Sequence, residues 1–246
     1  MHPFLLHALL LLIVISSRGA INVESDPSCA DPDTLEDDAL IQAIKANNYV
    51  QAVCLISKGF LLNYKDNHGN TALHWAVGQG KDRLAKLLVN EGADLDVEAA
   101  AGYTALMIAN MGKHIELAKL MIKKNAKLDK QTDEGYSALI LAAGEGLVEI
   151  VKLLLKNDCN IDLVDKGGWS ALMYASSKGY SDVVEVLLKK GANVETRDPK
   201  DGKTALVLAL EAEHDEIAEM IKARDFFLKK GPKNEKISRA VKAREL

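Results

Sequence analysis

The side chains that could do chemistry are present, but their spacing does not assemble a reaction centre. The chain has six His and three Cys, yet it contains no HExxH or Cys-x-x-Cys spacing of the kind that holds zinc. Gly-x-Gly occurs at 78–80 and 144–146, without the preceding strand that a phosphate-binding loop needs. No Ser-His-Asp or Cys-His arrangement is indicated. We therefore predict a protein that is not an enzyme and that holds no cofactor and no metal.

The elements that must position these residues recur along the chain. Of 246 residues 48% are hydrophobic, which is ample for one folded array with tails. Gly-x-Thr/Ser-Ala-Leu recurs in steps of 33, 33, 33 and 34 residues, beginning at Gly69, Gly102, Gly135, Gly168 and Gly202. A fixed period of this length indicates stacked units, each too small to bury its own apolar face. Such arrays usually present a long surface to a partner.

Each period predicts a turn followed by two short helices. Thr71 is placed as an N-cap, and the helices are expected over 72–79 and 81–91, the second with an apolar stripe. A left-handed C-cap should then end each second helix. The residues at that position are all Gly, Asn or Asp, which tolerate this geometry: Gly59, Gly92, Asn125, Asp158, Gly191 and Asp225.

The unit resembles the ankyrin repeat. Gly69-Asn-Thr-Ala-Leu-His74, Gly92-Ala-Asp94 and Gly191-Ala-Asn193 match its pattern, although Ala replaces the usual Pro at the helix start and only His74 keeps the usual His. The resemblance implies an all-α ankyrin-repeat solenoid of stacked helix-turn-helix units with β-turn fingers. It covers residues 36–228, with Asp38 replacing Thr as N-cap of the first unit, and the units are about 36–65, 66–98, 99–131, 132–164, 165–197 and 198–228.

In this family, partners are bound by the finger tips and the concave face of the inner helices. Carried over to this chain, the expected contacts are His68, Asn70, Tyr103, Met111, Tyr136, Glu145, Trp169, Lys178 and Lys203. Tyr103, Tyr136 and Trp169 follow consecutive turn glycines and predict an aromatic ladder with steps of roughly 10 Å. The alternative is that each ring packs on the next finger. Trp75 and Tyr174 occupy an aliphatic position of other units and are interpreted as core.

The composition favours another protein as the partner. The net charge is −4, and the candidate surface mixes both signs, whereas a nucleic-acid backbone would need clustered Lys and Arg. The identity of the partner is not readable from these residues, because a fold does not fix a function. We expect a monomer that binds no nucleic acid.

The first nineteen residues are typical of an export leader. Residues 4–15 are apolar apart from His7, too short a run to span a bilayer. Cleavage after Gly19 would leave an acidic arm over 20–35 and no stable membrane insertion. The predicted role is a scaffold of the secretory pathway, secreted or held in the endoplasmic reticulum lumen. The alternatives are a secreted effector acting on another cell, and a cytoplasmic adaptor whose leader is misread or an uncleaved anchor.

The cysteines and the basic tail add two smaller expectations. Cys54 and Cys159 are predicted to be small apolar core residues and Cys29 to be the one thiol free to react. In the tail, 229–246, Ile237 and Val241 would line one side of a short basic helix together with Leu246. The final residues 243–246 resemble a lumenal retrieval signal; the alternative is a frayed charged end.

Overall fold

The computed structural model describes residues 35–230, with side chains as far as residue 226. The described residues form two compact units that divide between Asp94 and Leu95, here called unit 1 (up to residue 94) and unit 2 (from residue 95). Over the described residues the chain contains twelve α-helices, one short 3-10 helix and no strand. The expected all-α class is confirmed.

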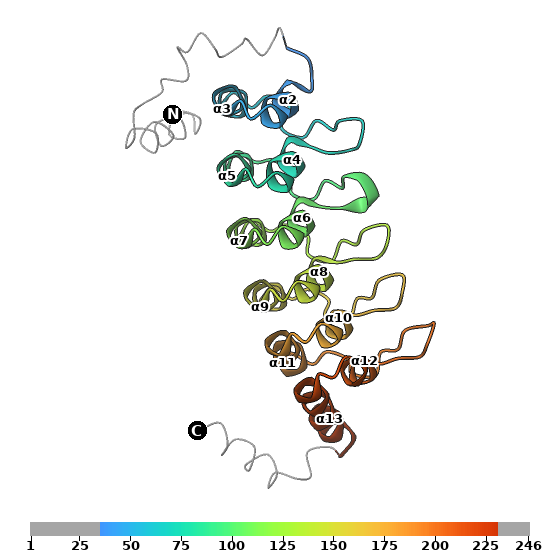
Figure 1. Cartoon of the computed structure of the whole chain (residues 1–246). Coiled ribbons are helices and arrows are strands. Elements are labelled where there is room, and N and C mark those ends of the chain that lie inside the picture. Colours follow the sequence, from blue (N-terminus) through green and yellow to red (C-terminus); the bar gives the residue numbers. More distant parts are fainter. Residues whose placement is uncertain (1–34, 231–246) are drawn as a thin grey trace, which may run out of the picture. The chain divides into compact units, whose positions relative to one another are not determined.

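Unit 1 contains two helix pairs, each made of an inner helix followed by an outer helix. The pairs are α2 (Ala39–Lys45) with α3 (Tyr49–Ser57), and α4 (Ala72–Gly78) with α5 (Asp82–Asn90). The inner helices α2 and α4 pack on each other, and so do the outer helices α3 and α5. A loop, here called a finger, leads into α4 (Figure 1).

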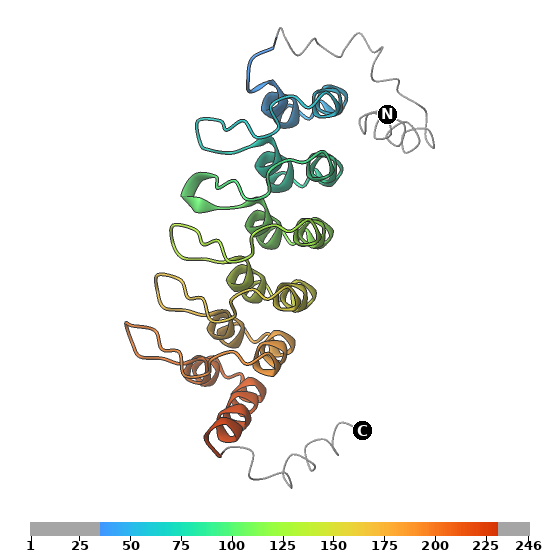
Figure 2. The same ribbon diagram turned by 180° about the vertical axis from the view of Figure 1, so that it is seen from behind.

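Unit 2 repeats this plan four times. Its elements are η4 (Ala100–Gly102), α6 (Ala105–Met111), α7 (Ile115–Lys123), α8 (Ala138–Gly144), α9 (Val148–Lys156), α10 (Ala171–Ser177), α11 (Ser181–Lys189), α12 (Ala205–Glu211) and α13 (Asp215–Lys230). Each inner helix contacts the next inner helix, and each outer helix the next outer helix. Both views place the fingers of this unit beside the inner row, away from the outer row (Figures 1 and 2). This is the predicted ankyrin-type solenoid arrangement.

The local signals that define the helix ends are mostly confirmed. A Thr or Ser occupies the N-cap of each inner helix from α4 to α12. Asp38 occupies the N-cap of α2, but its carboxylate accepts from the Gln42 side chain and makes no cap bond. Left-handed backbone ends the outer helices at Gly59, Gly92, Asn125, Asp158 and Gly191. The prediction was wrong at Asp225, because α13 continues through it to Lys230.

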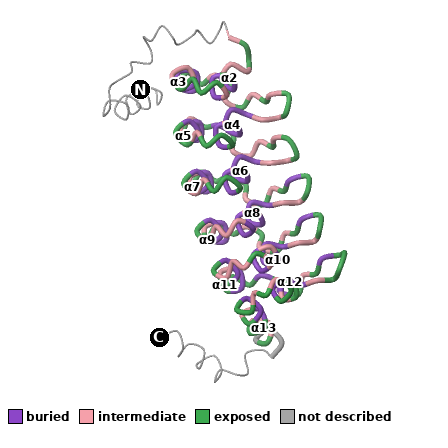
Figure 3. The backbone as a smooth tube through the Cα atoms, in the orientation of Figure 1, coloured by how far each residue is buried: buried purple, intermediate pink, exposed green. Residues whose placement is uncertain are grey.

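The apolar faces of the helices form the core of each unit, and exposed residues gather at the finger tips (Figure 3). Cys54 is buried in α3, as expected. It is, however, disulfide-bonded, so its interpretation as a free apolar thiol was wrong. Cys159 is a free thiol and only half-buried. Burial, aided by the Asp129 carboxylate, raises the pKa of the Cys159 thiol to about 12.

A second repeated contact ties each loop to the one that follows it. An Asn or Asp side-chain oxygen accepts from a backbone N–H 31 residues later, at 2.7–2.9 Å. In unit 1 the pair is Asn63 with Asp94; in unit 2 the pairs are Asp96 with Lys127, Asp129 with Asn160 and Asp162 with Asn193. These bonds satisfy amides that no helix or strand would satisfy.

Several expectations lie outside the described residues. They concern the leader over 1–19, the acidic arm up to residue 34, Cys29 and the tail from residue 231 onward. Over residues 35–230, no helix is both long and apolar enough to cross a membrane.

Candidate partner-binding surface

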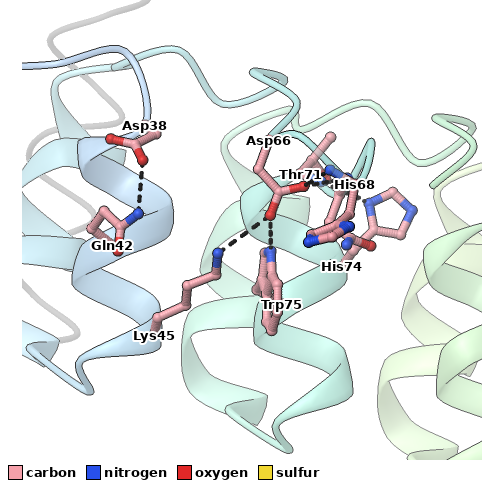
Figure 4. A network of polar contacts seen from close by, with 9 residues as sticks. Asp38, Gln42, Lys45, Asp66, His68, Thr71, His74 and Trp75 are labelled. Carbon is pink, nitrogen blue, oxygen red and sulfur yellow. Dashed lines mark hydrogen bonds and ion pairs between the residues drawn. The ribbon is translucent and has the colours of Figure 1, made fainter. Parts of the chain in front are cut away.

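In unit 1 the finger that carries His68 and Asn70 is organised by one carboxylate. The Oδ1 atom of Asp66 accepts from the backbone N–H groups of His68 and Asn70, both at 3.0 Å. Its Oδ2 atom accepts from the Trp75 indole N–H at 2.8 Å and from Lys45 Nζ at 3.3 Å (Figure 4). The finger is thus tied to α4 through Trp75 and to α2 through Lys45. His68 is exposed and Asn70 half-buried.

The charge of Asp66 is stabilised where it lies. Burial alone would raise the pKa of its carboxyl, but the bonds from Trp75, from the Asn70 and His68 amides and from Lys45 outweigh it, so the pKa is lowered. Lys45 Nζ also lies 4.1 Å from the centroid of the Trp75 ring, a cation–π contact. At neutral pH the Asp66 carboxylate is therefore ionised and fully engaged.

The same contact between a finger carboxylate and an aromatic side chain of the following inner helix recurs in unit 2. Tyr174 of α10 donates its hydroxyl to Asp165 Oδ2 at 2.6 Å, and Asp165 Oδ1 accepts from the Trp169 amide at 2.9 Å. Burial and the Asp165 carboxylate raise the pKa of the Tyr174 hydroxyl, which stays protonated. Trp75 and Tyr174 are thus half-buried and tether their fingers, so their interpretation as core residues was wrong. Spacing carried a signal that was missed: both aromatics lie nine residues after an Asp.

The predicted aromatic ladder takes a different form. The Tyr136 ring meets the Tyr174 ring edge-on at 6.2 Å between centroids, and the Trp169 ring lies 5.1 Å from Tyr174. Tyr174 therefore joins the two finger aromatics, and the three make a half-buried aromatic patch. Tyr103 is half-buried as well, but among the described residues it has no ring contact with this patch.

Charged residues border the aromatic patch. Glu145 pairs with Lys113 at 3.2 Å and with Lys178 at 3.9 Å. Lys178 Nζ also donates to the backbone carbonyl of Gly144 at 2.6 Å. A Cβ atom added at Gly144 would lie 3.8 Å from the Tyr174 ring and 3.9 Å from Lys178 Nζ. Both side chains therefore lie directly against the backbone of α8 at Gly144.

The remaining predicted contacts are placed separately. Met111 is 49% exposed and is the last residue of α6, whereas Glu145 and Lys178 cap α8 and α10 one position later in the repeat. Lys203 is half-buried and pairs with Glu211 at 2.8 Å. The structure thus brings Tyr136, Trp169, Glu145 and Lys178 together around Tyr174, and leaves Met111, Tyr103 and Lys203 outside this cluster.

The turn, cap and helix-pair pattern matches a known family. The family model described as "Ankyrin repeats (3 copies)" matches residues 7–99, 79–165, 106–198 and 145–230. The chain belongs to the ankyrin-repeat family. Among solved structures, this ankyrin-repeat protein is similar to the crystal structure of EF0377, an ankyrin repeat protein, with a TM-score of 0.70 and 29% identity. The likeness covers 77% of this chain and 98% of that one.

A curated relative shares a shorter stretch. The ankyrin repeat protein FPV219 of Fowlpox virus (strain NVSL) is 46% identical over 55 residues, which are 22% of this chain. The match spans 13% of that relative's length. It therefore supports the repeat and carries no information on the remainder of either protein.

Over the described residues, no three His, Cys, Asp or Glu side chains lie together as metal ligands would. The carboxylates of Asp66 and Asp165 hold fingers against helices. What the surface offers is a rigid aromatic patch with a charged border, which suits recognition.

Proposed function

We propose that this ankyrin-repeat protein is a non-catalytic scaffold of the secretory pathway that binds a protein partner through the aromatic patch of unit 2. The observation that supports it is the meeting of Tyr136, Trp169 and Tyr174 on the finger side of α8 and α10. Aromatic rings held in one orientation offer large contact area at little entropic cost, and Tyr and Trp are enriched among binding hot spots.

The border of the patch would set which partner fits. Glu145 with its two lysines presents both signs within a few ångströms. Such pairs add specificity and orientation more than affinity. The partner surface should accordingly be apolar at its centre and carry charges of both signs at its rim.

Binding is tested with the double variant Tyr136→Ala/Trp169→Ala. The full-length protein carries an affinity tag in its native cells, and partners are quantified by mass spectrometry. Loss of two hot-spot rings costs about 2 kcal/mol or more in binding, so recovery of the principal partner should fall by at least about tenfold. Tyr49→Ala is the matched control, because Tyr49 is an exposed aromatic of unit 1.

Stability must be followed alongside binding. The two rings also contact Tyr174, so the double variant should lose about 1–2 kcal/mol of folding free energy from those contacts. Recovery is therefore compared at a temperature where circular dichroism shows both variants to be folded. Equal recovery of the partner by the double variant and by Tyr49→Ala would refute the aromatic patch as the binding surface.

The compartment is a separate part of the proposal. The disulfide at Cys54 supports it, because disulfides form and persist in oxidising compartments and are rare in the cytosol. The leader-like first nineteen residues point the same way. The mature N-terminus should be Ala20, measured by mass spectrometry in medium and cell fractions. Detection only in the medium would favour the secreted effector, and a soluble chain beginning at Met1 would favour the cytoplasmic adaptor.

A further inference from the structure

The last inner helix of the array exposes an apolar face that the earlier inner helices bury. In unit 2, α6, α8 and α10 are each followed by another inner helix that packs on them. Asn110 of α6 shows the direction of this face, since its side chain donates to the Ala138 carbonyl at the start of α8. Over the described residues, no inner helix follows α12.

Three residues of α12 occupy buried positions of the repeat without being buried. Leu206 is half-buried, Val207 is 37% exposed and Leu210 is 46% exposed; we call these three residues the C-terminal face. The corresponding residues of α6, α8 and α10 are at most 2% exposed: Leu106, Leu139 and Leu172 for the first position, Met107, Ile140 and Met173 for the second, and Asn110, Ala143 and Ser176 for the third.

The outer face of a terminal repeat is normally polar and exposed to water, whereas the exposed face of α12 is apolar. A polar end would carry charged residues at the Val207 and Leu210 positions, whereas here the sequence keeps large aliphatic side chains. Burying an aliphatic side chain is favourable relative to leaving it in water. The aliphatic side chains of Val207 and Leu210 are therefore typical of a helix face that is covered by another segment.

The chain itself supplies a segment in the right place. α13 is sixteen residues long, and Gly231-Pro232 follow its last residue directly. Pro cannot continue a helix, and a Gly before it favours a sharp change of direction. Residues 233–246 then remain, which as a helix would measure about 21 Å, longer than the seven-residue α12 at about 10 Å. Their length suffices to return across α12.

The chemistry of that segment matches the face. Ile237, Ala240 and Val241 are spaced at i, i+3 and i+4, so a helix would place them on one side. The segment carries five Lys or Arg against two Glu. The end of the array that it would meet has five exposed acidic residues, namely Glu211, Glu213, Asp215, Glu216 and Glu219.

We propose that residues 233–246 form a short amphipathic helix that folds back and covers the C-terminal face, with Ile237 and Val241 against Val207 and Leu210. The tail is then a structural cap of unit 2, and its basic side chains lie against the acidic end of the array. This assignment explains both the apolar character of α12 and the opposite charges of the two segments.

The test uses the full-length chain and two variants of equal charge. Ile237→Asp/Val241→Asp places two carboxylates on the side that would touch α12. Ser238→Asp/Ala243→Asp places two carboxylates elsewhere on the same helix and serves as the matched control. Hydrogen exchange of α12 and α13 amides is measured by mass spectrometry. Exchange should become about tenfold faster in the first variant, about 1.4 kcal/mol of lost protection, and stay unchanged in the control.

A contact measurement decides which molecule covers the face. A photo-crosslinking benzophenone side chain at position 207 should give a cross-link within the same chain to a peptide of residues 231–246. Cross-links between two copies would assign the face to a dimer, and cross-links to another protein would assign it to a partner. Either of these, or equal exchange in the two variants, would overturn the proposal. Because neither variant alters the aromatic patch, partner binding through Tyr136 and Trp169 is not tested by this experiment.

Discussion

Replacing Asp66 by Ala should destabilise unit 1 and loosen the finger that presents His68. The Asp66 side chain is only 10% exposed, and it accepts from the Trp75 indole, two finger amides and Lys45. Alanine keeps the backbone and removes every one of these acceptors. The perturbation is therefore confined to one network, which belongs entirely to unit 1.

The expected cost follows from these bonds. A partly buried indole N–H left without an acceptor costs about 1–3 kcal/mol, and bonds to a charged acceptor are stronger than neutral ones. The two finger amides lie where water can replace the carboxylate, so they add about 1 kcal/mol or less. We expect a total loss of about 2–3 kcal/mol for Asp66→Ala. Asp66→Asn keeps one acceptor oxygen and should lose about 1 kcal/mol.

The two tryptophans make the assay specific, because Trp75 lies in unit 1 and Trp169 in unit 2. In a Trp169→Phe background, fluorescence-monitored urea unfolding reports only the surroundings of Trp75. With a slope of about 2 kcal/mol/M, the midpoint should fall by about 1–1.5 M. Asp37→Ala removes an exposed carboxylate of the same unit and should change stability by no more than about 0.5 kcal/mol.

The pH dependence of unfolding tests whether the charge of Asp66 stabilises the folded state. The pKa of Asp66 is lowered in the folded state, so its stabilisation is present above the unfolded value of about 3.9 and is lost as the pH falls through the folded value. The difference between wild type and Asp66→Ala should therefore shrink below about pH 4. A midpoint for Asp66→Ala equal to that of Asp37→Ala at pH 7 would refute the reasoning.

Three further predictions concern the loops and the cysteines. Asp129→Ala removes the acceptor of the Asn160 amide and should cost about 0.5–1.5 kcal/mol, measured by chemical unfolding followed through Trp169, with Asp133→Ala as the exposed control. Because the Cys159 pKa is raised to about 12, its thiol should react with iodoacetamide at pH 8 more than tenfold slower than in the urea-unfolded chain, and reaction at the unfolded rate would contradict this. Folding stability should fall as the pH rises above about 9, because the unfolded thiol then ionises while the folded one does not. Peptide mapping without reduction should find Cys54 disulfide-linked; alkylation of Cys54 in the unreduced, unfolded protein would be the contrary result.

Signals carried by one residue and its near neighbours were predictable from the sequence. A turn glycine, a Thr or Ser cap and a Gly, Asn or Asp stop each fix the local backbone, so helix positions and left-handed ends followed directly. Asp225 shows the limit of this reasoning. The residues around it favour helix, no glycine follows before residue 231, and a single Asp costs only about 0.5 kcal/mol in a helix. Continuing α13 through Asp225 therefore costs less free energy than ending it in a turn there.

The contacts that organise the surface needed two positions to be considered together. Asp66 with Trp75 and Asp165 with Tyr174 each combine a carboxylate and an aromatic donor nine residues apart. The corresponding positions of two other repeats hold Ala99 with Ile108 and Thr132 with Leu141, and so lack both partners. Comparison of repeats within this one chain could have revealed the pairing. Considering the aromatic position alone suggested only an apolar core residue.

Pairing within the chain also decides how the surface can bind. Glu145, Lys178 and Lys203 were predicted as partner contacts, but each already has a charged neighbour at 2.8–3.9 Å. A partner would exchange these exposed pairs for new ones, and such pairs contribute at most about 1 kcal/mol each. The rings of Tyr136 and Trp169 would keep their contacts with Tyr174 when a partner covers them. Affinity should therefore come from the aromatic patch, and the charges around it should mainly determine which partner is accepted.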